Sequence, residues 1–170
     1  MEQLQRTVQT PHGFFTFVEE DSCIIQVRFG QAADACEEAS PLLLAAEEQL
    51  LAYFDGMLRS FSLPAAAKGT PFQKQCWDAL LAIPYGETMT YGQLAKMIGR
   101  PGAVRAVGMA AHRNPLPILI PCHRLIGSGG RLTGYAGGIP LKEALLQLEQ
   151  NAARPSVGEK PESRQQETKE

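Results

Sequence analysis

The chain has 170 residues, of which 44% are hydrophobic and 20% charged, so it can bury a sizeable core and is not disordered overall. A chain of this length needs no disulfide or metal to hold its fold, which excludes the small disulfide-scaffold class. The N-terminal stretch lacks the pattern of a signal peptide, and no run reaches the roughly 18 apolar residues of a membrane span. We therefore expect a cytoplasmic protein that makes no membrane contact and keeps its cysteines reduced: Cys23, Cys36, Cys76 and Cys122.

The formal net charge of −2 hides an asymmetry between two segments. Residues 1–67 carry three basic and ten acidic side chains, a balance of −7, whereas residues 68–150 carry nine basic and four acidic ones, a balance of +5. A basic segment of this kind is typical of a part that meets a polyanion. Charged faces that contact only solvent would give the same count, so charge alone leaves both interpretations open.

The N-terminal segment predicts a small α/β unit. Residues 13–18 and 23–29 are β-rich runs joined by a polar turn, which indicates a hairpin. A helix is expected over 41–54, because Ser40 and Pro41 provide a start signal and the following residues are strong helix formers. Cys23 and Cys36 are interpreted as packing or loop thiols, so this unit is expected to carry no chemistry.

A domain boundary is expected near residue 67, because Pro and Gly cluster there and the charge changes sign. We divide the chain into an N-terminal domain over 1–67, a second domain over 68–152 and a disordered polar tail over 153–170. The second domain begins with a helix over 71–83, whose apolar face includes Cys76 as a core thiol.

Two short helices are predicted next, over 90–98 and 103–112, with a Gly-containing turn between them. This is the spacing of a helix-turn-helix. The second helix is rich in alanine and glycine, which suits either close approach to a nucleic-acid groove or tight packing in a core.

Residues 114–126 form an apolar run broken by three prolines, which predicts a fixed, irregular path instead of a central strand. Near its end stand Cys122, His123 and Arg124, and neighbouring imidazole and guanidinium groups favour the nucleophilic thiolate. Because adjacent side chains in an extended segment point to opposite faces, we expect Cys122 and His123 to communicate through a water. Glu149, on a final helix over 140–150, is the acid best placed to orient the imidazole.

No cofactor and no metal are expected. The glycine-rich stretch 127–138 follows the cysteine segment and lacks the strand–turn–helix context of a dinucleotide fingerprint. The three histidines, His12, His112 and His123, do not have the spacing of metal ligands.

Residues 70–150 resemble the O6-alkylguanine-DNA alkyltransferases, also called methylated-DNA–protein-cysteine methyltransferases. The signature Ile-Pro-Cys-His-Arg stands at 120–124, followed by Leu125 where valine is more usual in the family. Residues 1–67 match the family's variable N-terminal domain by position more than by motif. Five further blocks stand in the family's order and spacing, at 90–95, 105–108, 114–115, 134–138 and 142–146.

The resemblance implies an α/β N-terminal domain that consists of a small antiparallel sheet plus a helix and is ribonuclease H-like. A mostly α, winged-helix-like C-terminal domain with a helix-turn-helix follows. It implies a DNA repair protein that flips the damaged base and moves the alkyl group irreversibly to its own Cys122, once per molecule. The implied partner is double-stranded DNA containing O6-alkylguanine, with O4-alkylthymine as an alternative lesion, bound through the minor groove by a monomer.

The resemblance also implies roles for single residues. The chemistry would be carried by Cys122, His123 and Glu149, and by Tyr91, which would protonate the guanine at N3 and crowd the 3′ phosphate. Arg105 would replace the flipped nucleotide in the stack. The remaining residues implied to contact DNA are Ala106, Gly108 and Asn114, of which Asn114 would also form the hinge between the recognition helix and the cysteine segment. The base pocket would be lined by Pro117, Leu125, Tyr135, Ala136 and Gly137.

Three other functions fit parts of the sequence. An alkyltransferase-like protein would bind the lesion without repair, but such proteins lack the nucleophile that Cys122 provides. A helix-turn-helix regulator would explain the basic turn and helices but not the Cys-His segment, and it would bind one sequence tightly. A Cys-His hydrolase would need an oxyanion hole, and the residues after Cys122 offer no clear one.

Overall fold

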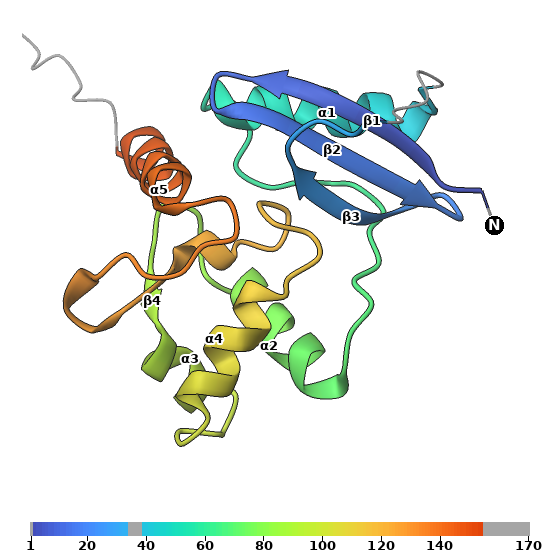
Figure 1. The fold of residues 1–170 in the computed structure, drawn as a ribbon. Helices are drawn as coiled ribbons and strands as arrows, with labels where there is room; N and C mark the ends of the chain where they lie inside the picture. Colours follow the sequence, from blue (N-terminus) through green and yellow to red (C-terminus); the bar gives the residue numbers. More distant parts are fainter. Residues whose placement is uncertain (1, 34–38, 155–170) are drawn as a thin grey trace, which may run out of the picture.

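The computed structural model describes residues 2–33 and 39–154 (Figure 1). Cys36 and residues 155–170, which make up most of the predicted tail, lie outside the described part. In chain order the elements are β1 (Leu4–Thr10), β2 (Gly13–Glu20), β3 (Cys23–Phe29), α1 (Pro41–Phe54), α2 (Pro71–Leu81), β4 (Met89–Thr90), α3 (Tyr91–Met97), α4 (Val104–His112), η1 (Cys122–Arg124), β5 (Leu125–Ile126), η2 (Ser128–Gly130) and α5 (Ile139–Ala153).

The N-terminal part is an antiparallel sheet in the order β1-β2-β3, with α1 packed against β1 and β2 (Figure 1). The predicted β2–β3 hairpin and the helix after it are confirmed. Strand β1 was not predicted, because its sequence LQRTVQT is mostly polar and only weakly alternating. It forms because pairing with β2, from Leu4↔Glu19 to Thr10↔Gly13, satisfies its backbone.

The free edge of β3 is covered by two other segments of the chain. The Ile24 N–H donates to the Pro64 carbonyl and the Ala66 N–H to the Ile24 carbonyl, at 2.8 and 3.0 Å. Further along the strand, the Val27 N–H donates to the Pro115 carbonyl at 2.9 Å. The N-terminal sheet is therefore hydrogen-bonded directly to the segment that leads to Cys122.

The next three helices form the lower layer of the molecule in Figure 1. Thr70 and Thr90 start α2 and α3 with capping boxes, each pairing with the glutamine three residues later. Helix α2 ends at Leu81, two residues before the predicted end. The predicted pair of short helices is present as α3 and α4.

Helix α4 confirms the packing interpretation of its small residues and leaves one face open. One face is packed, with Val107, Ala110 and Ala111 buried, and the Trp77 indole of α2 donates to the Ala110 carbonyl at 2.9 Å. The opposite face is open, and the Met109 side chain is 57% exposed. The small residues therefore allow close packing on one side while a flat face stays accessible on the other.

The last helix, α5, closes the fold beside the N-terminal part and buries Leu145, Leu146, Lys142 and Glu149. Among the helices of residues 2–33 and 39–154, none combines the length and apolar character needed to cross a membrane. Two charged side chains on the inner face of α5 are unusual in a core, and charges buried this way need partners.

Candidate active site

The segment before Cys122 follows a fixed path. The Asn114 side chain spans it, with Nδ2 donating to the Ile120 carbonyl at 2.8 Å and Oδ1 accepting from the Leu116 N–H at 2.9 Å. Ile118 has φ +72°, a left-handed conformation that a β-branched residue rarely adopts. The surrounding packing holds this strained backbone in place, as is common next to functional sites.

Cys122, His123 and Arg124 lie in a single 3₁₀ turn, η1, and all three are buried. The expectation of an extended segment at this point was wrong, because the Arg124 N–H donates to the Pro121 carbonyl and closes a turn. In this turn the Cys122 and His123 side chains still point in different directions. Cys122 lines a small pocket, whereas His123 points to Glu149 on α5.

Glu149 accepts hydrogen bonds from three side chains and one backbone N–H. Its Oε2 accepts from His123 Nε2 at 2.5 Å and from the Tyr53 hydroxyl at 2.6 Å. Its Oε1 accepts from Arg124 Nε at 2.7 Å and from the Gly86 N–H at 3.2 Å. Arg124 also donates through Nη2 to Oε2 at 3.3 Å and through Nη1 to the Ile83 carbonyl at 2.7 Å. The structure thus joins Glu149 to His123 and adds partners that the sequence did not indicate.

These contacts fix the protonation of the cluster. Burial alone would raise the pKa of Glu149, but the hydrogen bonds from His123, Arg124 and Tyr53 outweigh it and lower that pKa to about 2. Burial lowers the pKa of His123 despite the nearby carboxylate. The resting pair is therefore a carboxylate beside a neutral imidazole, which is able to take up a proton.

The tautomer of His123 follows from its partners. Because Glu149 is an ionised acceptor, Nε2 carries the hydrogen and Nδ1 is the basic nitrogen. Within the described residues, the buried Nδ1 atom has no hydrogen-bond partner. His123 is thus oriented through Nε2, which leaves Nδ1 as the nitrogen that can accept a proton.

The Cys122 thiol is not activated by its surroundings alone. Burial raises its pKa, while the Asn114 side chain and the charge of Lys142 act in the opposite direction. Lys142 is fully buried and donates to the Thr133 carbonyl at 3.1 Å. A thiol in this setting needs a base to become a nucleophile, and a nearby cation then stabilises the thiolate.

The pocket at Cys122 is narrow. Three of the five predicted base-pocket residues, Pro117, Tyr135 and Ala136, line it, whereas Leu125 is fully buried in the core and neither Leu125 nor Gly137 reaches the lining. The free space is about 10 Å³, room for about one water-sized sphere. The remaining lining residues are Tyr91, Ala111, His112, Asn114 and Gly134.

A larger hollow of about 650 Å³ lies over the open face of α4 and contains Arg105, Gly108 and Met109. Arg105 and Ala106 are exposed. This hollow shares three residues with the Cys122 pocket, namely Tyr91, His112 and Gly134. The two spaces therefore meet, and the Tyr91 hydroxyl, which donates to the Thr133 carbonyl at 3.3 Å, stands where they join.

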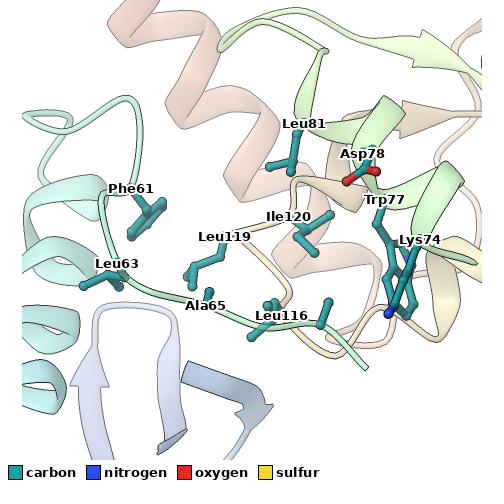
Figure 2. Close-up of a pocket in the computed structure, with 11 residues that line it drawn as sticks. Phe61, Leu63, Ala65, Lys74, Trp77, Asp78, Leu81, Leu116, Leu119 and Ile120 are labelled. Carbon is teal, nitrogen blue, oxygen red and sulfur yellow. The ribbon is translucent and has the colours of Figure 1, made fainter. Parts of the chain in front are cut away.

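A third hollow, of about 430 Å³, lies behind the active-site segment, between α2 and the linker that follows α1 (Figure 2). Leu116, Leu119 and Ile120 project into it from the segment, opposite Phe61 and Leu63. Its walls are mainly apolar. The charged side chains of its lining are Lys74 and Asp78, both from α2.

Sequence reasoning did not assign roles to Tyr53 and Lys142, and it expected Arg124 to act on the thiol, whereas the guanidinium binds Glu149 and the Ile83 carbonyl. Tyr53 belongs to α1, 96 residues before Glu149, and looks like an ordinary apolar-face residue of that helix. Among residues 2–33 and 39–154, no group of three or more His, Cys, Asp or Glu side chains is arranged to hold a metal ion.

Known proteins similar to this chain point to one activity. Residues 71–151 match the family described as 6-O-methylguanine DNA methyltransferase, DNA binding domain. A methylated-DNA–protein-cysteine methyltransferase of Methanosarcina acetivorans is 54% identical over 119 residues, which cover 70% of this chain and 76% of the relative. The protein of the same name from Mycolicibacterium paratuberculosis is 42% identical over 157 residues, covering 89% of this chain and 95% of the relative.

Solved structures agree with these relatives. The Mycobacterium tuberculosis O6-methylguanine methyltransferase has a TM-score of 0.80 and 42% identity, covering 92% of this chain and 98% of that chain. A Mycobacterium tuberculosis protein solved in complex with DNA has a TM-score of 0.79 and 45% identity, covering 88% and 94%. The likeness extends over the N-terminal sheet as well as over the helices around Cys122.

Proposed function

The chain belongs to the O6-methylguanine DNA methyltransferase family, and from this premise we propose that it removes alkyl groups from O6 of guanine in DNA and keeps them on its own Cys122. The observation that carries the proposal is the buried cysteine followed by a histidine whose Nε2 is bound to an ionised glutamate. DNA is the partner, as in the related Mycobacterium tuberculosis complex.

In the proposed reaction, the Cys122 proton passes to Nδ1 of His123 through one water, since the two side chains do not meet directly. The thiolate attacks the alkyl carbon on O6; the S–C bond forms and the C–O6 bond breaks. The electron pair of that bond stays with the guanine, which takes a proton at N3 from the Tyr91 hydroxyl. Lys142 stabilises the thiolate before transfer.

The product is a thioether on Cys122, which no neighbouring side chain is placed to hydrolyse. Each protein molecule therefore acts once. The pair of Glu149 and His123 has to accept one proton only, so it needs no route for repeated exchange with solvent, and its near-complete burial fits this use.

The lesion reaches Cys122 by leaving the double helix. The exposed face of α4 lies in the minor groove, with Ala106 and Gly108 allowing close approach and Arg105 replacing the flipped nucleotide. The base enters past Tyr91 and is held by Tyr135, Pro117 and the backbone near Ala136. Since the pocket has room for about one water, the glycine-rich segment around Gly134 moves to admit a base.

The finer architecture is also a proposal. The sheet and helix of residues 1–67 form a ribonuclease H-like domain, and residues 68–152 form a winged-helix-like domain, in which α3 and α4 are the helix-turn-helix. Asn114 acts as the hinge between α4 and the cysteine segment. All the proposed groups come from one chain, so a monomer suffices.

The test is the intact mass of the protein after incubation with a short duplex carrying one O6-methylguanine. A gain of one methylene on Cys122, saturating at one per protein and absent in Cys122→Ala and with undamaged duplex, is expected. Binding of the lesion duplex without any mass gain would instead indicate a damage-sensing protein. A duplex carrying O4-methylthymine, run in parallel, determines whether the second lesion is accepted.

A further inference from the structure

We propose that Tyr53, from the N-terminal part of the chain, is a positioning residue for alkyl transfer: its hydroxyl holds the Glu149 carboxylate, and through it His123, in the arrangement that receives the Cys122 proton. This inference rests on the proposed function, which gives that proton to His123. It assigns the N-terminal sheet and α1 a direct part in the chemistry, although the Cys122 pocket is built from the second half of the chain.

The Tyr53 hydroxyl directly restrains the Glu149 carboxylate. The Tyr53 hydroxyl donates to Oε2 at 2.6 Å, the same oxygen that accepts from His123 Nε2 at 2.5 Å, and it lies 3.5 Å from Nε2 itself. Tyr53 and Glu149 are each 1% exposed and His123 is fully buried. A displaced carboxylate would therefore turn the imidazole, because Glu149 makes the short hydrogen bond to the ring and Nδ1 has no partner within the described residues.

The same hydrogen bond also sets how basic the pair is. A carboxylate with fewer donors is more basic and holds a neighbouring imidazolium more strongly. Loss of the Tyr53 hydroxyl should therefore raise the pKa of His123, which burial now keeps low. The other titratable or charged groups facing this pair are Cys122 and Arg124 of η1, Tyr85 of the loop after α2, Tyr135 of the glycine-rich segment and Lys142 of α5.

Tyr85 provides a matched control. Its ring packs edge-on against Tyr53, with centroids 6.3 Å apart, and its buried hydroxyl has no hydrogen-bond partner in the described part of the chain. Tyr85→Phe therefore removes a buried hydroxyl from the same cluster without removing a bond to Glu149. Any effect of lost polarity or slight repacking is common to Tyr53→Phe and Tyr85→Phe.

Two measurements on the full chain test the proposal. The first is the single-turnover rate of methyl transfer from the lesion duplex, quenched in time and read by mass. Tyr53→Phe should be slower than wild type by about tenfold, the lower end of what outer hydrogen-bond partners contribute in metal sites, and Tyr85→Phe should stay within about twofold. The second is the titration of the His123 ring by NMR, which needs no DNA.

The His123 titration should move to higher pH in Tyr53→Phe and match wild type in Tyr85→Phe. A slower rate with an unmoved titration would assign Tyr53 a merely structural role, and a shifted titration with an unchanged rate would separate it from the transfer; either result overturns the proposal. Thermal unfolding of both variants verifies that each one is folded at the temperature of the rate and titration measurements. If wild type transfers no methyl group, the proposed function fails, and the titration alone still decides whether Tyr53 controls His123.

Discussion

The Glu149 cluster and the exposed face of α4 are built in opposite ways. The cluster, defined as Tyr53, His123, Arg124 and Glu149, combines side chains from α1, η1 and α5 and is almost inaccessible to solvent. The α4 face, defined as Val104, Arg105, Met109 and His112, belongs to one helix and is open. The proposed proton transfer thus depends on groups that distant elements bring together, whereas the proposed DNA contact depends on the surface of a single helix. Substitutions in the two regions should separate stability from DNA capture.

The largest effect on stability is expected from Glu149→Ala. It leaves Arg124 and His123 buried without their acceptor, and breaking a buried ion pair in this way costs about 3–5 kcal/mol of the free energy of unfolding. Urea unfolding measures the loss. Glu143→Ala, on the exposed side of the same helix, should change it by less than about 0.5 kcal/mol. Equal losses in the two variants would contradict the distinction between core and surface charge.

Acid should act on the same cluster. The pKa of Glu149 in the folded protein is about 2, below its ordinary 4.5, so its contribution to stability is complete above pH 4.5 and is lost as pH falls from 4.5 towards 2. The loss amounts to roughly 3 kcal/mol at most. Urea unfolding from pH 6 to pH 3 should show a steep decline in wild type and a flatter one in Glu149→Gln. Parallel declines would mean that other carboxylates dominate acid unfolding.

An intermediate effect is expected from Asn114→Ala, at the junction of α4 and the cysteine segment. The change removes both side-chain hydrogen bonds that span the segment and leaves the Ile120 carbonyl and the Leu116 N–H of two buried residues without these partners, at a cost of about 1–3 kcal/mol. The pKa of Cys122 should also rise, because Asn114 lowers it. Unfolding in urea and the pH dependence of Cys122 reaction with a small thiol reagent measure the two changes.

The smallest effect on stability, and a large one on DNA, is expected from Arg105→Ala. Arg105 is exposed, so the free energy of unfolding should stay within about 0.5 kcal/mol of wild type. Transfer from a lesion duplex should fall by about tenfold or more, because the variant lacks the side chain that we propose to replace the flipped nucleotide in the stack. Arg100→Ala is the control, because Arg100 lies in the turn before α4 and does not line the hollow over the open face of that helix. A similar loss of transfer in both variants would point to general charge instead of Arg105.

Local signals predicted much of the fold. The β2–β3 hairpin, α1 with its Ser40 and Pro41 start, and the two short helices around a Gly-containing turn were all predicted close to their observed places. Strand β1 was missed because a polar strand is defined by its partner more than by its own residues. The turn at Cys122 was predicted as extended because the closing hydrogen bond to Pro121 leaves no local mark in the sequence.

The sequence by itself determined the family, and it indicated Cys122 as the proposed nucleophile with His123 and Glu149 beside it, because the Cys-His-Arg block and the helix carrying Glu149 stand in a recognisable order. Only the tertiary structure decided what else holds these groups. Tyr53 reaches Glu149 across 96 residues, and Arg124 turns inward to the same carboxylate. Such contacts depend on how distant elements pack in three dimensions, since a buried carboxylate draws its hydrogen bonds from whichever donors the fold places around it.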